Sequence, residues 1–117
     1  MTTFSKLVLS GSTNGLPIPV AGTAIGAQTT LHTSHATDLD EVWLWVTNTD
    51  SAARTITITC GGNVDPTNLV IDALSLPAGQ SMLLIIPGVS TTNSKVWAAF
   101  ASVASVVNVM GFVNRIT

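Results

Sequence analysis

Apolar and polar residues alternate with a period of two along most of this 117-residue chain. The alternation is unbroken over residues 54–60, where apolar side chains point to one face of an extended segment and threonines to the other. This pattern predicts a half-buried strand whose polar face, formed by Thr55, Thr57 and Thr59, meets water.

Seven further segments, each bounded by turn-forming residues, have the length and composition of strands. They are residues 4–9, 28–33, 41–48, 69–75, 81–86, 95–101 and 106–116. The polar turn at residues 49–52 predicts that the strands on either side of it form a hairpin. Pro87 and Gly88 are expected to end the strand that begins at residue 81. Residues 96–107 are the best candidate for a helix, but their Val and Trp content favours a strand.

Residues 16–20 contain Pro17 and Pro19, each of which lacks the amide hydrogen that a sheet interior requires. We therefore expect a strand and an extended arm within residues 1–30, followed by a sandwich core over residues 31–117. The regular spacing of short strands predicts one domain over residues 1–117. Its expected fold is an all-β, antiparallel β-sandwich of about eight strands, with a jelly-roll-like topology.

Four of the predicted strands are apolar on both faces, whereas a sandwich strand buries only one face in the core. They cover residues 42–46, 82–86, 96–101 and 106–113. Either the arm at residues 11–30 and the loops cover the second faces, or neighbouring subunits do. Large exposed apolar patches usually mark interaction surfaces. We therefore expect a homo-oligomer whose contacts include Trp43, Trp45, Trp97, Pro17, Pro19, Met110 and Phe112.

The chain has only four basic and six acidic residues, with a formal net charge of −2 at pH 7. So few charges suit a component that buries much of its surface in an assembly. The basic residues are scattered, which argues against nucleic-acid binding. No apolar run approaches the roughly 20 residues that span a bilayer. The single cysteine, Cys60, excludes an internal disulfide and is expected to be a small core residue.

The densest group of possible metal ligands comprises His32, His35, Asp38, Asp40 and Glu41. Residues three positions apart on a strand face opposite ways, so both histidines can meet one ion only in a loop. An ordinary polar turn is the favoured interpretation. The chain also lacks a nucleophile motif such as Gly-x-Ser-x-Gly, and we expect no catalysis, no cofactor and no metal site.

The three tryptophans indicate one alternative function, because aromatic rings on a flat sheet can stack on sugar rings. Trp43, Trp45 and Trp97 would form the platform of a glycan-binding module, with Thr47 and Asn48 fixing hydroxyl groups. The competing interpretation places the indoles under the arm or at a subunit contact, where tryptophan is enriched.

Four stretches of the chain resemble small virion proteins encoded among the head genes of tailed bacteriophages. They are KLVLSGSTNG from Lys6, LDEVWLWVTN from Leu39, LPAG from Leu76 and GFVNRI from Gly111. The resemblance implies a capsid decoration or cement protein, a small β-rich domain that is often a trimer and braces neighbouring subunits of an assembled shell. Its partners would be its own copies and the phage major capsid protein, on the virion surface after synthesis in the host cytoplasm. A component of the neck, tail or baseplate is the alternative.

Overall fold

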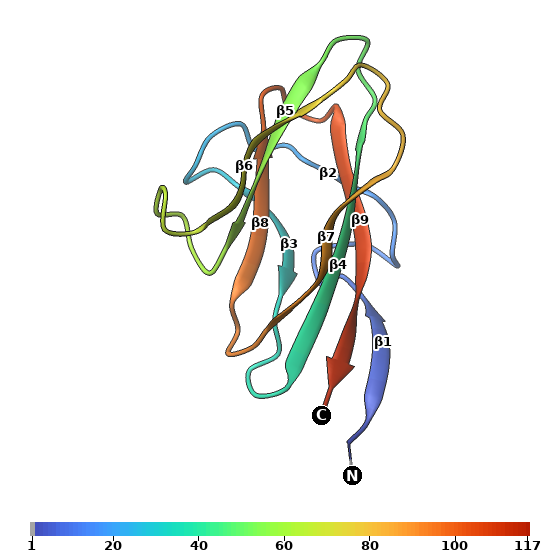
Figure 1. Ribbon diagram of the computed structural model, residues 1–117, viewed down its shortest axis with the longest axis vertical. Helices are drawn as coiled ribbons and strands as arrows, with labels where there is room; N and C mark the ends of the chain where they lie inside the picture. Colours follow the sequence, from blue (N-terminus) through green and yellow to red (C-terminus); the bar gives the residue numbers. More distant parts are fainter. Residues whose placement is uncertain (1) are drawn as a thin grey trace.

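The computed structural model of the protein describes residues 2–117, which form nine β-strands in two antiparallel sheets (Figure 1). Sheet A has the order β1-β9-β4-β7, with β2 also paired to β9, and sheet B has the order β3-β8-β5-β6. The strands are β1 (Phe4–Val8), β2 (Ile18–Pro19), β3 (Thr29–Thr33), β4 (Leu39–Asn48), β5 (Arg54–Cys60), β6 (Leu69–Leu76), β7 (Leu83–Thr91), β8 (Val96–Ala101) and β9 (Val107–Ile116). The predicted single-domain, antiparallel β-sandwich is confirmed.

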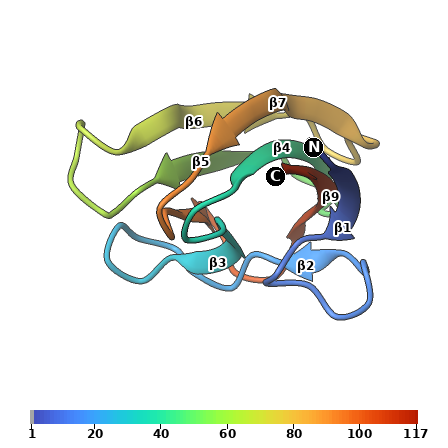
Figure 2. The same ribbon diagram turned by 90° about the horizontal axis from the view of Figure 1, so that it is seen from below.

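The strand pairing follows a jelly-roll scheme. The first half of the chain pairs with the second half in reverse order, β1 with β9, β3 with β8, β4 with β7 and β5 with β6. This arrangement is a long hairpin, with its tip at the β5–β6 connection, rolled up so that its strands fall into two sheets. Figure 2 shows the strands around the core, with β2 and β3 on one side and β6 and β7 on the opposite side.

Inward side chains of both sheets form one core. The pattern is clearest in β4, where every second residue from Asp40 to Asn48 is buried. Sheet B contributes Ile56, Ile58 and Ala99 to this core, and all three are fully buried. The regular alternation of β4 and β5 therefore does place one face of each strand inside, as the sequence predicts.

Two predictions about strand connections are wrong. The strands before and after residues 49–52 are β4 and β5, and they lie in different sheets instead of forming a hairpin. The strand that begins near residue 81 also continues past Pro87 to Thr91. Its register shifts there, and Gly88, with φ of 81°, is the extra residue of a bulge. Proline is tolerated in β7 because this strand lies at the sheet edge.

The N-terminal arm closes its own sandwich. Leu9, Ile18 and Val20 are buried core residues. Val20 donates its amide hydrogen to the carbonyl of Val107 in sheet A, and the Gly22 carbonyl accepts a hydrogen bond from Ala101 in sheet B. The arm thus ties the two sheets of one chain together.

The threonine face of β5 is covered, in contrast to the prediction that it meets water. Thr57 and Thr59 are both buried. Gln28 of the arm donates from Nε2 to Thr59 Oγ1 at 2.8 Å, and Ala73 of β6 donates its amide hydrogen to Thr57 Oγ1 at 3.0 Å. Hydroxyl groups that find such partners can be buried at low cost.

Candidate functional site

The outer face of sheet A carries three aromatic rings at its centre. Trp43 on β4 lies opposite Phe112 on β9, and Trp45 lies opposite Met110. The ring centroids of Trp43, Trp45 and Phe112 are 5.9–6.4 Å apart, and the ring planes lie within 10–27° of parallel. We call these three residues the aromatic cluster. Each of them is half-buried and leaves part of its ring accessible.

A row of polar groups bounds the aromatic cluster on one side. Lys6, Asn114 and Glu41 lie next to one another on β1, β9 and β4. Lys6 Nζ is 4.7 Å from the centroid of the Phe112 ring, which is a cation–π contact. Glu41 Oε1 accepts hydrogen bonds from Trp43 Nε1 at 2.8 Å and from Asn114 Nδ2 at 3.3 Å. These contacts hold the rings in place and give the surface a charged rim.

Gly88 fixes the position of Trp43 from the side of β7. A Cβ atom at residue 88 would lie 2.9 Å from Cζ2 of the Trp43 indole, closer than real side chains approach. The bulge in β7 therefore brings the backbone of Gly88 into direct contact with the Trp43 indole. The contact with Gly88 and the hydrogen bond to Glu41 restrict the rotamers of Trp43, so a partner would meet an ordered surface.

Aliphatic side chains extend the aromatic cluster toward both edges of sheet A. On β1, Val8 lies opposite Phe112, and Phe4 is 71% exposed. At the β7 edge, Leu84 lies opposite Trp45, and it is exposed together with Met82. A contiguous apolar surface with a polar rim is typical of an interaction site.

The structure brings together most, but not all, of the predicted contact residues. Trp43, Trp45, Met110 and Phe112 share the outer face of sheet A. Pro19 lies opposite Asn108, at the end of the same face, and both Pro19 and Pro17 are exposed. β2 pairs with β9 of its own chain, so this part of the arm packs on its own sandwich while both prolines stay on the surface.

Trp97 is separated from the other two tryptophans. It points into the core from sheet B, with 1% of its surface exposed, opposite Cys60 on β5 and His32 on β3. Its Nε1 donates a hydrogen bond to Thr91 Oγ1 at 3.0 Å. Trp97 therefore cannot contribute to a surface contact or to a platform of three indoles. The expectation fails because both faces of β8 are apolar, so that the sequence does not show which face is inside.

The sequence pattern does not indicate Lys6 or Gly88 as contact residues, and it groups Glu41 with the possible metal ligands. The period of two could have placed Glu41 beside Trp43, because residues i and i+2 share a face of a strand. Lys6 and Gly88 become neighbours of the aromatic cluster only through the pairing of strands distant in sequence.

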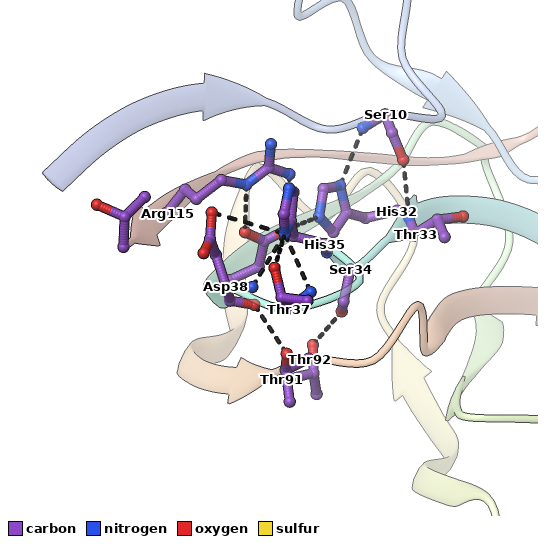
Figure 3. Close-up of polar contacts among 12 residues, drawn as sticks. Ser10, His32, Thr33, Ser34, His35, Thr37, Asp38, Thr91, Thr92 and Arg115 are labelled. Atoms are coloured by element: carbon purple, nitrogen blue, oxygen red, sulfur yellow. Dashed lines mark hydrogen bonds and ion pairs between the residues drawn. The ribbon is translucent and has the colours of Figure 1, made fainter. Parts of the chain in front are cut away.

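An ion pair between a buried aspartate on β4 and a partly exposed arginine on β9 joins these two strands. Figure 3 labels the arginine, Arg115, together with His32 and His35. Arg115 donates from Nε to Asp40 Oδ1 at 2.7 Å and from Nη2 to Oδ2 at 3.0 Å. The Asp40 side chain is fully buried. Burial alone would raise the pKa of Asp40, but hydrogen bonds from Arg115 and His32 and the charge of Arg115 outweigh it and lower this pKa from 3.8 to about 2.

His32 links this ion pair to the segment that follows β1. Its Nδ1 accepts a hydrogen bond from the Ser10 amide at 3.0 Å, and its Nε2 lies 2.7 Å from Asp40 Oδ2 (Figure 3). Because Nδ1 accepts, the ring proton is on Nε2, which donates to Asp40. Both ring nitrogens of this buried histidine thus have partners within the fold.

His35 belongs to the turn before β4. Its Nδ1 accepts hydrogen bonds from the amides of Thr37 at 3.1 Å and Asp38 at 2.9 Å. Within residues 2–117, no group of three or more His, Cys, Asp or Glu residues is placed to hold a metal ion. The two imidazole rings have separate partners, one in the core and one in a polar turn, and His35 reaches Asp40 only through its backbone amide.

Cys60 faces the core from the end of β5 and packs against its buried residues. Burial raises the pKa of its thiol above the usual value, which keeps the thiol protonated at neutral pH. A protonated thiol is a poor nucleophile. The position of Cys60 therefore provides no activated group.

The chain matches no protein-family model, no curated protein and no solved structure. Among the described residues, no helix has the length and apolar character needed to cross a membrane.

Proposed function

We propose that the protein is a non-enzymatic structural component of a tailed bacteriophage virion that decorates or cements the capsid. In this role, the outer face of sheet A packs against other copies of the chain and against the major capsid protein. The virion assignment comes from the sequence resemblance, and the single structural observation that supports a contact role is the ordered apolar face around the aromatic cluster. Viral capsid domains are among the users of the jelly-roll architecture, although a fold alone does not specify a function.

The physical basis of the proposal is the free energy gained when the exposed apolar face leaves water. Burying one large apolar side chain contributes about 1.5–3 kcal/mol. Trp43 and Trp45 are of the residue type most often found at the energetic centre of protein interfaces. Repetition of the contact over many equivalent sites of a shell adds avidity, so each copy requires only modest affinity.

Truncation of Trp45 is expected to reduce attachment to the virion without unfolding the chain. Trp45→Ala should weaken binding of the purified protein to phage particles that lack it by at least about tenfold, because the variant loses a central aromatic contact. Bound copies per particle are counted by quantitative mass spectrometry after sedimentation. Val70→Ala is the control, since Val70 is an exposed apolar residue on β6 of sheet B and lies outside the proposed contact face.

Equal copy numbers for wild type and Trp45→Ala would show that the outer face of sheet A is not the attachment surface. Binding confined to the neck, tail or baseplate would replace the capsid assignment by the alternative virion position. Circular dichroism of both variants verifies that the sandwich is intact.

A further inference from the structure

A second surface feature lies on the other side of the molecule, on the outer face of sheet B. It is a hollow of about 270 Å³. Its lining includes four hydroxyl groups, one carboxylate and one aromatic ring, which belong to Thr23, Thr55, Thr57, Ser102, Asp72 and Phe100. The hollow has no basic side chain in its lining.

Four separate segments build the hollow. Thr57 on β5 lies opposite Phe100 on β8, which places their side chains next to each other on the floor. Two residues before Thr57 on β5, the Thr55 amide donates a hydrogen bond to Ser102 Oγ at 3.0 Å. The arm places Thr23 at the rim, because the carbonyl of Gly22 accepts a hydrogen bond from the Ala101 amide of sheet B.

A bulge in β6 supplies the carboxylate. The register between β5 and β6 shifts at this point, so that two residues of β6, Asp72 and Ala73, lie against the single residue Thr57 of β5. Ala73 has a φ of 49°, which is uncommon for a residue with a side chain. The Ala73 amide donates to Thr57 Oγ1, and this bond holds the bulge over the hollow. Bulges often re-aim a side chain at a binding site.

Polar groups of the hollow remain available to a ligand. Within residues 2–117, the side chains of Asp72, Thr55 and Thr23 make no hydrogen bond or ion pair. Thr57 is buried at the floor of the hollow, where its Oγ1 accepts a hydrogen bond from the Ala73 amide, so the groups open to a ligand are those of Asp72, Thr55 and Thr23. The site therefore offers both donors and acceptors beside one apolar ring.

The chemistry of this lining selects among ligand classes. Phosphate groups and other anions are disfavoured, because the one charged group is acidic. A metal ion would need more than the single carboxylate. A sugar ring fits both parts of the lining, since its hydroxyl groups can pair with Asp72 and the threonines while its C–H face packs on Phe100.

We propose that this hollow binds a neutral sugar residue, with Asp72 accepting hydrogen bonds from sugar hydroxyls and Phe100 packing against the ring. The inference does not depend on the proposed virion role. The hollow and the aromatic cluster lie on the outer faces of different sheets, so one chain can be attached through sheet A and still present sheet B to a glycan.

A neighbouring hollow serves as an internal comparison. It has a volume of about 240 Å³ and is lined by Gln28, Thr30 and Asn63 together with small residues. It lies on the same face but has no aromatic and no charged side chain. Asn63→Ala is therefore a matched surface variant that leaves the proposed sugar site unchanged.

Saturation-transfer NMR of the full chain with glucose, galactose, mannose and N-acetylglucosamine tests the proposal, with N-acetylneuraminic acid as the charged comparison. We expect binding of at least one neutral sugar. Asp72→Asn and Phe100→Leu should each weaken this binding by about tenfold or more, whereas Asn63→Ala should leave it within about twofold. Asp72 is exposed, so Asp72→Asn should fold even if a change at the half-buried Phe100 does not.

The assignment would be overturned by no transfer to any neutral sugar, by stronger transfer to N-acetylneuraminic acid, or by transfer that persists unchanged in both site variants. Loss of transfer in Asn63→Ala alone would assign the sugar to the neighbouring hollow and would also overturn it. None of these results bears on attachment through sheet A, which the particle-binding assay measures separately.

Discussion

Trp97→Ala is expected to lower the free energy of unfolding by about 3–5 kcal/mol, the range found when a large buried aromatic side chain is removed. The indole is buried in the core, on β8 between β3 and β5, and its removal leaves a cavity that rigid strands cannot close. The loss is a large part of the roughly 5–15 kcal/mol that stabilises a typical domain. Urea denaturation of the isolated chain, followed by circular dichroism, measures it.

Trp45→Ala is the control for this prediction, because it removes the same side chain from the half-exposed outer face. We expect its cost to be less than half that of Trp97→Ala. If the two variants lost equal stability, the assignment of Trp97 to the core and Trp45 to the surface would be contradicted.

Acid should remove the stabilisation that the Asp40–Arg115 ion pair provides. The pKa of Asp40 falls from 3.8 to about 2 on folding, so the carboxylate stabilises the fold fully above pH 3.8 and loses this effect as the pH falls toward 2. A shift of this size corresponds to about 2 kcal/mol. For the wild type, the free energy of unfolding from denaturation curves should be higher at pH 6 than at pH 2 by at least this amount. For Asp40→Asn, the difference should be smaller by about 2 kcal/mol.

At pH 6, Asp40→Asn itself should cost about 3 kcal/mol, because Arg115 and His32 lose the buried charge that pairs with them. Asp50→Asn is the matched control. Hydrogen bonding from Arg54 lowers the pKa of Asp50 as well, but that pair lies at the surface, where ion pairs stabilise proteins little. An equal acid response in wild type and Asp40→Asn would refute the role given to Asp40.

The periodicity of the sequence predicts where the strands lie but not how they pair. β5 and β9 begin and end within a residue of the predicted positions. The pairing of β4 with β7 and β9, in place of β5, depends on contacts between residues distant in sequence. The turn at residues 49–52 has the composition of a hairpin turn, yet it carries the chain from one sheet to the other. Local composition does not distinguish a hairpin turn from a connection between two sheets.

The contact surface is only partly predictable for the same reason. Alternation along β4 separates the valines and Leu44 from Trp43 and Trp45, and the structure places the first set inside and the indoles outside. In β8 both faces are apolar, and the decision between them rests on Phe100 lying beside Thr57 in the neighbouring strand. The cover over Thr57 and Thr59 comes from the arm and from the β6 bulge, neither of which leaves a periodic signal.

A cryo-microscopy reconstruction of the intact virion would show directly whether the outer face of sheet A is buried in an assembled particle. We expect density for this jelly roll on the shell, with Trp43, Trp45 and Phe112 in contact with a neighbouring copy or with the major capsid protein. A reconstruction in which the chain is on the shell with these three rings facing solvent would contradict this expectation, as would a particle without the chain.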